Sequence, residues 1–239
     1  MGRGVGRIDA VHNDTAFDLY VVFMGVMTDP RDIEAKDTGG LAVCWSCKGP
    51  VSRAAPFCET CGAIQPPHAA DHFERLGLAR GFDVGEDELQ RRYFALQAQL
   101  HPDRFANRTA TERAASLAQA TALNEAYRTL RDPLLRAGYL LGLHGVTAAT
   151  DSSETVDDPE LLMESLERRE ALAEAETVDQ VVAIAESAES DARTAIGALG
   201  VAFAANDLTA ASRLATRLKY LTKLAEEARV RLARMRETP

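Results

Sequence analysis

Two stretches of the sequence decide the fold: Tyr93-Phe-Ala-Leu-Gln-Ala-Gln-Leu-His101-Pro-Asp103 and Leu123-Asn-Glu-Ala-Tyr-Arg-Thr-Leu-Arg-Asp-Pro133. The first stretch ends a predicted helix with a single apolar stripe, formed by Leu89, Tyr93, Leu96 and Leu100. This helix must end near Leu100, because the residue before a proline avoids the α region and Pro102 follows closely. The second stretch belongs to another helix, whose predicted core side carries Leu117, Ala120, Asn124, Tyr127 and Leu130. Two long helices joined by an exposed loop predict an antiparallel hairpin, whose loop residues have no packing role: His101, Pro102 and Asp103.

The sequence on either side of this hairpin predicts two shorter helices. Before it, Asp71-His-Phe-Glu-Arg-Leu-Gly-Leu places Phe73 and Leu76 on one side of a short helix. After it, Asp132 and Pro133 are typical of the cap and first residue of a helix, which we expect over 134–143. We therefore expect one helical domain over residues 70–145.

A second helical region follows a polar link over residues 146–158. Three helical stretches are predicted over 159–174, 177–200 and 207–236, and Gly200 and Asn206-Asp207 mark the break between the second and the third. Their lengths and short connections predict a three-helix bundle over residues 159–236. The expected fold is thus all-α, and residues 1–38 resemble nothing that we can assign.

All four cysteines lie in a loop-rich segment over residues 39–67, as Cys44-Trp-Ser-Cys47 and Cys58-Glu-Thr-Cys61. Two residues between ligands let one turn present both sulfur atoms, and four thiolates satisfy a tetrahedral zinc ion. Gly49 and Gly62 follow the two pairs, and we expect them to supply the positive φ that such turns require. Two disulfides or a redox pair are the alternatives, but we see neither a secretion signal nor the strand–helix context of a redox motif. We expect a structural Zn²⁺ ion on Cys44, Cys47, Cys58 and Cys61.

Composition and charge exclude several classes of partner. The net charge of −9 and the pI near 5.1 argue against nucleic acid, which requires clustered Lys and Arg. The longest apolar stretch, over residues 19–27, is far shorter than the roughly 20 residues of a membrane helix. Asp9, Asp14 and Asp18 interrupt any secretory signal, while Arg3 and Arg7 are thin support for a mitochondrial presequence. We expect a cytoplasmic protein, with the mitochondrial matrix as the alternative.

The first helix of the predicted bundle has two apolar sides. On a helical wheel, Leu161 and Leu172 share one side, and a broad second side combines apolar with acidic residues: Leu162, Met163, Leu166, Glu167, Glu170 and Glu174. A bundle helix needs one stripe for its core, so the other is either a contact surface or the core stripe itself. Periodicity alone leaves these alternatives open.

The hairpin stretches resemble a J-domain, because His-Pro-Asp follows an amphipathic helix and precedes Asn-Glu-Ala-Tyr. The resemblance implies an ATPase-stimulating co-chaperone that catalyses nothing by itself and docks on a DnaK-type ATPase chaperone. It implies docking through His101, Pro102 and Asp103, with electrostatic support from Arg91, Arg92 and Arg104. Many J-domains carry more basic residues on the helix before the loop, where this chain has Phe94, Ala95, Ala98 and Gln99. Fewer charges mean weaker steering, which favours a dedicated partner.

Residues from about 71 to 236 resemble the HscB type of J-protein, which serves iron–sulfur cluster assembly. The stretches that carry this resemblance are Arg136-Ala-Gly-Tyr-Leu-Leu-Gly-Leu-His-Gly145, Leu161-Leu-Met-Glu-Ser-Leu-Glu-Arg-Arg-Glu-Ala-Leu172 and Arg217-Leu-Lys-Tyr-Leu-Thr-Lys-Leu224. The family implies that the apolar and acidic side binds an IscU-type scaffold protein, which favours the contact surface for that side. Carried over by position, the scaffold-binding residues are Leu162, Met163, Leu166, Glu167, Glu170, Glu174 and Tyr220.

Three other functions fit the sequence less well. A general J-protein for unfolded clients usually carries several zinc repeats and β-rich domains, which are missing from this sequence. A zinc-ribbon protein that binds nucleic acid conflicts with the acidic charge. An enzyme is least favoured, because His101 and Asp103 have no third group to complete acid–base chemistry.

Overall fold

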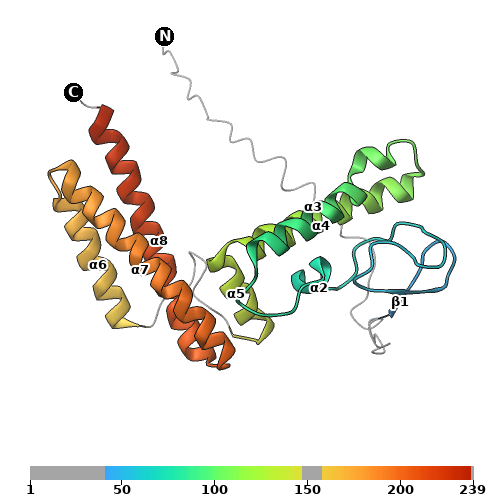
Figure 1. The fold of residues 1–239 in the computed structure, drawn as a ribbon, viewed down its shortest axis with the longest axis horizontal. Coiled ribbons are helices and arrows are strands. Elements are labelled where there is room, and N and C mark those ends of the chain that lie inside the picture. The colour runs from blue at the N-terminus through green and yellow to red at the C-terminus, as the bar shows by residue number, and fades with distance from the viewer. Residues whose placement is uncertain (1–40, 147–157, 238–239) are drawn as a thin grey trace, which may run out of the picture. The chain divides into compact units, whose positions relative to one another are not determined.

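The computed structural model describes residues 41–146 and 158–237, so the predictions for residues 1–38 and for most of the link lie outside the described residues. Two short strands, β1 (Leu41–Val43) and β2 (Pro50–Ser52), pair antiparallel in the cysteine segment. Apart from an isolated β-bridge between Phe57 and Ile64, the described elements after them are helices, as predicted (Figure 1). The helices are α2 (His72–Leu76), α3 (Glu86–Leu100), η1 (Pro102–Phe105), α4 (Ala110–Arg131), α5 (Pro133–Leu143), α6 (Pro159–Glu174), α7 (Val178–Ala204) and α8 (Leu208–Glu237).

Helices α3 and α4 form the predicted hairpin, but the core stripe of α4 differs from the prediction. Leu117 is 61% exposed, and Asn124 is exposed as well. The buried stripe runs through Ala115, Ser116, Gln119, Leu123, Ala126 and Leu130. The physical reason is that α4 packs against α2 and α5 as well as α3, which rotates its buried side away from Leu117. Tyr127 instead stacks on Tyr93 at the edge of the hairpin, with ring centroids 4.0 Å apart.

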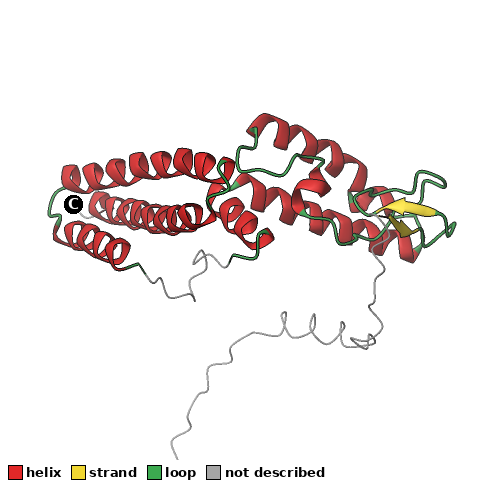
Figure 2. Ribbon diagram, turned by 90° about the horizontal axis from the view of Figure 1, so that it is seen from below, coloured by secondary structure: helices red, strands yellow, loops and turns green. Residues whose placement is uncertain are grey.

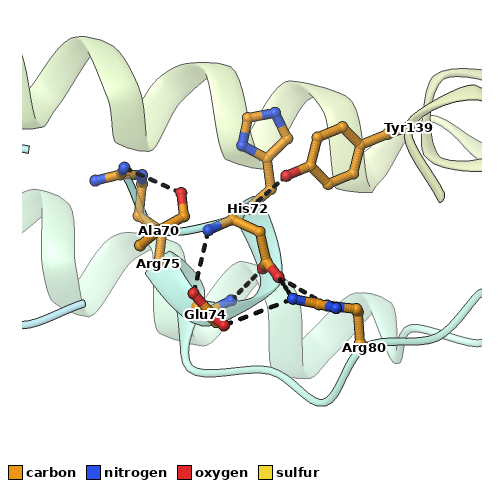
Figure 3. A network of polar contacts seen from close by, with 7 residues as sticks. Ala70, His72, Glu74, Arg75, Arg80 and Tyr139 are labelled. Atoms are coloured by element: carbon orange, nitrogen blue, oxygen red, sulfur yellow. Dashed lines mark hydrogen bonds and ion pairs between the residues drawn. The ribbon is translucent and has the colours of Figure 1, made fainter. Parts of the chain in front are cut away.

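The short helix α2 is capped at both ends and tied to α5. The Asp71 carboxylate accepts from the Glu74 amide at 2.7 Å, and Gly77 ends the helix in the left-handed region at φ +66°. The Tyr139 hydroxyl, from α5, accepts from the backbone N–H of His72 at 2.9 Å while the two rings stack (Figure 3). A helix of this length is unstable alone, so these contacts fix its position.

The bundle has three helices as predicted, but Gly200 does not break the second one. Helix α7 continues through Gly200 to Ala204, and the turn falls at Asn206, whose φ is +54°. Gly200 is buried, and a Cβ there would lie 2.8 Å from the Asp83 carboxylate of the α2–α3 loop. The glycine therefore permits a close approach between two parts of the chain rather than a helix end.

Helices α2 to α5 share one hydrophobic cluster with the end of α7 and the beginning of α8. Phe82 stacks on Phe203 at 5.4 Å, and the Arg136 guanidinium lies 4.8 Å from the centre of the Phe82 ring. Burial lowers the pKa of Arg136, whose Nη1 donates to the Leu130 carbonyl at 2.6 Å. Leu199 and Leu218, from α7 and α8, belong to the same cluster. A second cluster fills the far half of the bundle between α6, α7 and α8.

Replacing Phe82 by Ala tests this shared core. The change should cost about 3–5 kcal/mol and lower Tm by roughly 10 °C, because a buried ring at the junction is lost. Phe94→Ala is the matched control, since Phe94 is 52% exposed on the same domain and should cost about 1 kcal/mol or less. Calorimetry and circular dichroism measure both. A common core would be contradicted if the J-domain and the bundle unfolded in two separate thermal transitions and Phe82→Ala shifted only one of them.

Candidate functional site: the hairpin tip, the tetracysteine cluster and the outer face of α6

The His101-Pro102-Asp103 loop is anchored at its base and exposed at its tip. The buried Ser116 hydroxyl donates to the Leu100 carbonyl at 2.7 Å, which satisfies the free end of α3. Pro102 begins the 3₁₀ helix η1, and His101 Nδ1 accepts from the Asp103 amide at 3.3 Å. The side chains of His101 and Asp103 are 51% and 91% exposed. The loop is therefore a preformed projection that a partner protein can reach.

The three arginines predicted to support this loop differ in their surroundings. Arg92 pairs with Glu88 and also donates to the backbone carbonyls of Leu76 and Gly77, so it ties α3 to the end of α2. Arg91 pairs with the same carboxylate. The hydrogen bond from Arg92 lowers the pKa of Glu88 most, and Arg91 lowers it further. Arg104 is exposed on η1, directly after the loop. Arg91 and Arg104 are accessible at the surface, whereas the guanidinium of Arg92 is engaged in hydrogen bonds within the domain.

The four cysteines converge on one point. All four Sγ atoms lie within 4.8 Å of one another, and the Cys44–Cys61 and Cys47–Cys58 pairs are each 3.7 Å apart. Four sulfur ligands at about 2.3 Å from a tetrahedral ion would be separated by about 3.8 Å, so the cluster fits a metal. These distances also exclude disulfides in the structure, in which all four thiols are free. The arrangement supports the metal-site prediction over its two alternatives.

Each cysteine pair is followed by a residue in the left-handed region, but one of the two predicted glycines is wrong. Gly62 has φ +71°, whereas on the other side Lys48 takes this conformation at φ +64° in place of Gly49. Both residues come directly after the second cysteine of a pair, and their amides donate to the Cys44 and Cys58 carbonyls. The two turns are thus equivalent, and position after the cysteine decides the conformation rather than residue type.

Backbone amides favour thiolates in this cluster. Burial raises the pKa of Cys44, but the amides of Cys47 and Ser46 outweigh it and lower that pKa to about 6. The Gly49 amide lowers the pKa of Cys47, yet the neighbouring thiols raise it to about 11. Thiolates packed this closely repel one another, so a bound cation is needed before all four can ionise.

Gln65 joins the cluster to the helical domain, a role that the sequence did not reveal. Its side chain is fully buried, donating to Cys44 Sγ at 3.3 Å and to the Ala63 carbonyl at 2.8 Å. Its backbone carbonyl accepts from the side-chain amide of Gln119, on α4, at 2.9 Å. Next to it, Ile64 is buried in the shared core and accepts from the Trp45 indole N–H at 2.7 Å. The module is therefore docked on the hairpin, near the ends of α3 and α4 (Figure 2).

Helix α6 turns the predicted apolar and acidic side outward. Leu161 and Leu172 are buried, whereas Leu162, Met163 and Leu166 are 44%, 56% and 52% exposed. The exposed side also carries the three predicted acids: Glu167, Glu170 and Glu174. The core stripe of α6 is therefore the one through Leu161 and Leu172, which periodicity alone did not determine. We call the six exposed residues the α6 outer face.

Ion pairs on its inner side fasten α6 to the other two helices. Glu164 accepts from Arg217 at 2.8 Å and from Arg168 at 2.9 Å, and Arg168 also reaches Asp191 at 2.6 Å. The Arg217 hydrogen bond holds the pKa of Glu164 below its usual range. Tyr220 is half-buried in the groove between α6 and α8, beside Leu161 and Ser165. It lies on the inner side of α6, whereas the six other predicted scaffold residues lie on the outer face.

Two family models match the chain: the DnaJ domain over residues 71–139 and the HSCB C-terminal oligomerisation domain over residues 157–229. The chain is 33% identical to the human iron–sulfur cluster co-chaperone protein HscB over 192 residues, covering 79% of this chain and 81% of the human protein. It is 39% identical to a co-chaperone protein HscB homolog of Azoarcus, covering 66% of this chain and 90% of that one. The crystal structure of human HscB superposes with a TM-score of 0.74 at 32% identity, over 80% of this chain and 98% of that one.

The chain belongs to the HscB family of J-domain co-chaperones. The J-domain assigned from the His-Pro-Asp hairpin and the HscB resemblance assigned from the bundle are therefore confirmed. In the described ranges, 41–146 and 158–237, no helix combines the length and apolar character that crossing a membrane requires. For this member of the HscB family, the J-domain tip and the α6 outer face are the two exposed candidate surfaces, and the tetracysteine cluster is the candidate metal site.

Proposed function

We propose that this chain is a two-sided adaptor of iron–sulfur cluster assembly. One side binds an IscU-type scaffold protein, and the other brings it to a DnaK/HscA-type ATPase chaperone and stimulates ATP hydrolysis there. The observation that carries the proposal is the coexistence of an exposed, preformed His-Pro-Asp tip with a separate exposed apolar face on the bundle. Membership of the HscB family supports the same assignment.

The chaperone side acts through a loop whose shape is set before binding. Pro102 limits the backbone, and the Ser116 hydrogen bond holds the end of α3, so little conformational entropy is lost on docking. His101 and Asp103 then present a ring and a charge in fixed relation to the partner. Arg91 and Arg104 add positive charge around this contact, with a smaller contribution from Arg92.

The scaffold side acts through the α6 outer face. Leu162, Met163 and Leu166 supply most of the affinity, because central apolar anchors carry the energy of most interfaces. The rim of Glu167, Glu170 and Glu174 contributes orientation and association rate. Tyr220 contributes from the neighbouring groove. Holding scaffold and chaperone on one chain raises their effective concentration without new contacts between them.

The metal on Cys44, Cys47, Cys58 and Cys61 is proposed to be Zn²⁺ in a structural role. Four thiolates close the coordination sphere and leave no position for a substrate, as in structural zinc sites. Bound zinc supplies a cross-link between the two turns, in a segment whose own hydrophobic cluster is small. Gln65 donates to the Cys44 sulfur and so connects this cross-link with the J-domain.

The double substitution Leu162→Ala with Leu166→Ala tests the scaffold side. We expect scaffold affinity to fall about 30-fold or more, because two apolar anchors are truncated. Basal stimulation of the chaperone ATPase should remain, while the extra stimulation by scaffold is lost. Titration calorimetry and a steady-state ATPase assay measure the two effects.

Val201→Ala is the matched control, since Val201 is 71% exposed on the same bundle but lies on α7. It should change neither measurement. Unchanged scaffold binding in the double variant would show that the α6 outer face is not the site. Preferential capture of unfolded clients over the scaffold would instead support a general J-protein.

A further inference from the structure

An open groove of about 650 Å³ separates the tetracysteine module from the hairpin tip. This volume lies within the range of pockets that enclose a ligand group, roughly 300–1,000 Å³. Trp45, Ser46 and Phe57 line the module side, and Arg104, Phe105 and Arg108 line the hairpin side. We call this feature the tip groove.

Its lining combines an apolar floor with a basic hairpin wall. Phe57 and Phe105 pack on the shared core beneath the groove, and the Trp45 indole N–H is already bonded to the Ile64 carbonyl. On the hairpin wall, Arg104 and Arg108 are exposed. An apolar side chain on the floor and an acidic one against this wall would complement the groove.

The negative groups at the groove are already engaged. The Glu112 carboxylate accepts from the Thr109 amide at 3.0 Å and from its hydroxyl at 2.8 Å, as the cap of α4. These bonds, with a smaller effect from Arg108, lower the pKa of Glu112. Cys61 lies at the opposite wall, and its sulfur belongs to the tetracysteine cluster. The hairpin wall therefore offers two positive charges against one carboxylate that is engaged in capping.

The tip groove is continuous with the His-Pro-Asp loop. Helix η1 spans Pro102–Phe105, so one short helix presents Asp103 to solvent and then Arg104 and Phe105 to the groove. A protein that contacts His101 and Asp103 thus reaches the edge of the groove at the same time. By contrast, the exposed side of α3 offers Phe94, Ala95 and Ala98 in place of a row of charges.

We propose that the tip groove is a second contact for the DnaK-type ATPase chaperone. It takes an extended segment of that chaperone with an apolar side chain next to an acidic one. The inference rests on the proposed function, because it assumes the same partner at the tip. The tetracysteine module then has a binding role, forming one wall of the groove and adding affinity that the weakly charged α3 lacks.

The experiment places a negative charge on each wall of the groove in the full-length, metal-loaded protein. Ser46→Glu and Arg108→Glu should each weaken binding to the DnaK-type chaperone of the same organism, in its ATP-bound form, by about 5- to 10-fold. Ala54→Glu is the matched control, because Ala54 is exposed on the same module but does not line the groove. It should stay within about twofold of the unsubstituted chain. Metal content is measured for every variant.

A second readout uses Trp45, the single tryptophan of the chain. Replaced biosynthetically by 5-hydroxytryptophan, it is excited apart from any tryptophan of the partner, and its emission should change when the chaperone binds. Equal affinities for the three charge variants and the unsubstituted chain would overturn the groove contact. So would an emission change caused by the scaffold alone or by self-association of this chain.

The outcomes also separate this inference from the proposed function. If the unsubstituted chain stimulates the ATPase and His101→Gln does not, while Ser46→Glu and Arg108→Glu bind normally, the adaptor function stands and the groove contact is wrong. If the unsubstituted chain neither binds nor stimulates the chaperone, the proposed function itself fails.

Discussion

Substituting His101 by Gln should reduce ATPase stimulation of the DnaK-type chaperone to its basal rate, while Tm stays within about 1 °C. The ring is half exposed at the hairpin tip. The substitution removes the ring nitrogen that accepts from the Asp103 amide at 3.3 Å, but it leaves the Ser116–Leu100 hydrogen bond that holds the base of the loop. Exposed positions of this kind change stability by about 0.5 kcal/mol or less. Single-turnover ATP hydrolysis and thermal unfolding measure the two properties on one preparation.

Two further variants sharpen this test. Asp103→Asn keeps the shape of a side chain that is 91% exposed but removes its charge, so we expect a comparable loss of stimulation. Asn107→Ala, at an exposed position shortly after the tip, should leave stimulation unchanged. Full stimulation by the His101→Gln chain would remove the tip from the proposed mechanism.

Removing the metal should unfold the tetracysteine module and destabilise the J-domain with it. Structural zinc sites contribute about 10–16 kcal/mol of apparent binding free energy, which the short strands and three-residue core of the module cannot replace. Because Ile64 is buried in the shared core and Gln65 bonds to Gln119, their release should cost the J-domain about 2–4 kcal/mol. We therefore expect Tm to fall by roughly 5–10 °C after chelation.

Metal analysis, thermal unfolding and the emission of Trp45 follow this change together. The untreated protein should contain one zinc ion per chain, and adding zinc back should restore both signals. The double variant Cys44→Ser with Cys58→Ser serves as the control, because chelation should have no further effect on it. Stoichiometric iron in place of zinc, or a Tm that does not respond to chelation, would contradict the structural zinc site.

Local patterns in the sequence predict much of the fold, since they depend on rules that act within one helix. The end of α3 at Leu100 follows from Pro102, and α5 begins at Pro133 as the Asp132-Pro133 pair indicates. The cysteine cluster follows from spacing alone. The error at Gly49 lies within a single turn, but the other two occur where distant parts of the chain meet. Leu117 is exposed because α4 buries another side against α2, α3 and α5, and Gly200 lies within α7, where the missing Cβ leaves room for Asp83.

The candidate sites also include parts that local patterns predict and parts that depend on long-range contacts. The exposed tip and the α6 outer face are local features, and the wheel of α6 separates its two sides correctly even though periodicity does not say which is buried. Gln65, Ser116 and the tip groove depend on contacts between segments far apart in the chain. Only the buried polar character of such residues marks them, and burial is not visible in one sequence.

Helices α7 and α8 each contribute to both hydrophobic clusters, the one beneath the J-domain and the one beneath α6. The length of these two helices, at about 1.5 Å per residue, therefore sets the distance between the J-domain and the α6 outer face. Deleting or adding one turn in both helices would change this distance and rotate the α6 outer face, although every residue of that face would still be present. In the proposed function, such a variant would hold the scaffold protein at a different position relative to the ATPase chaperone.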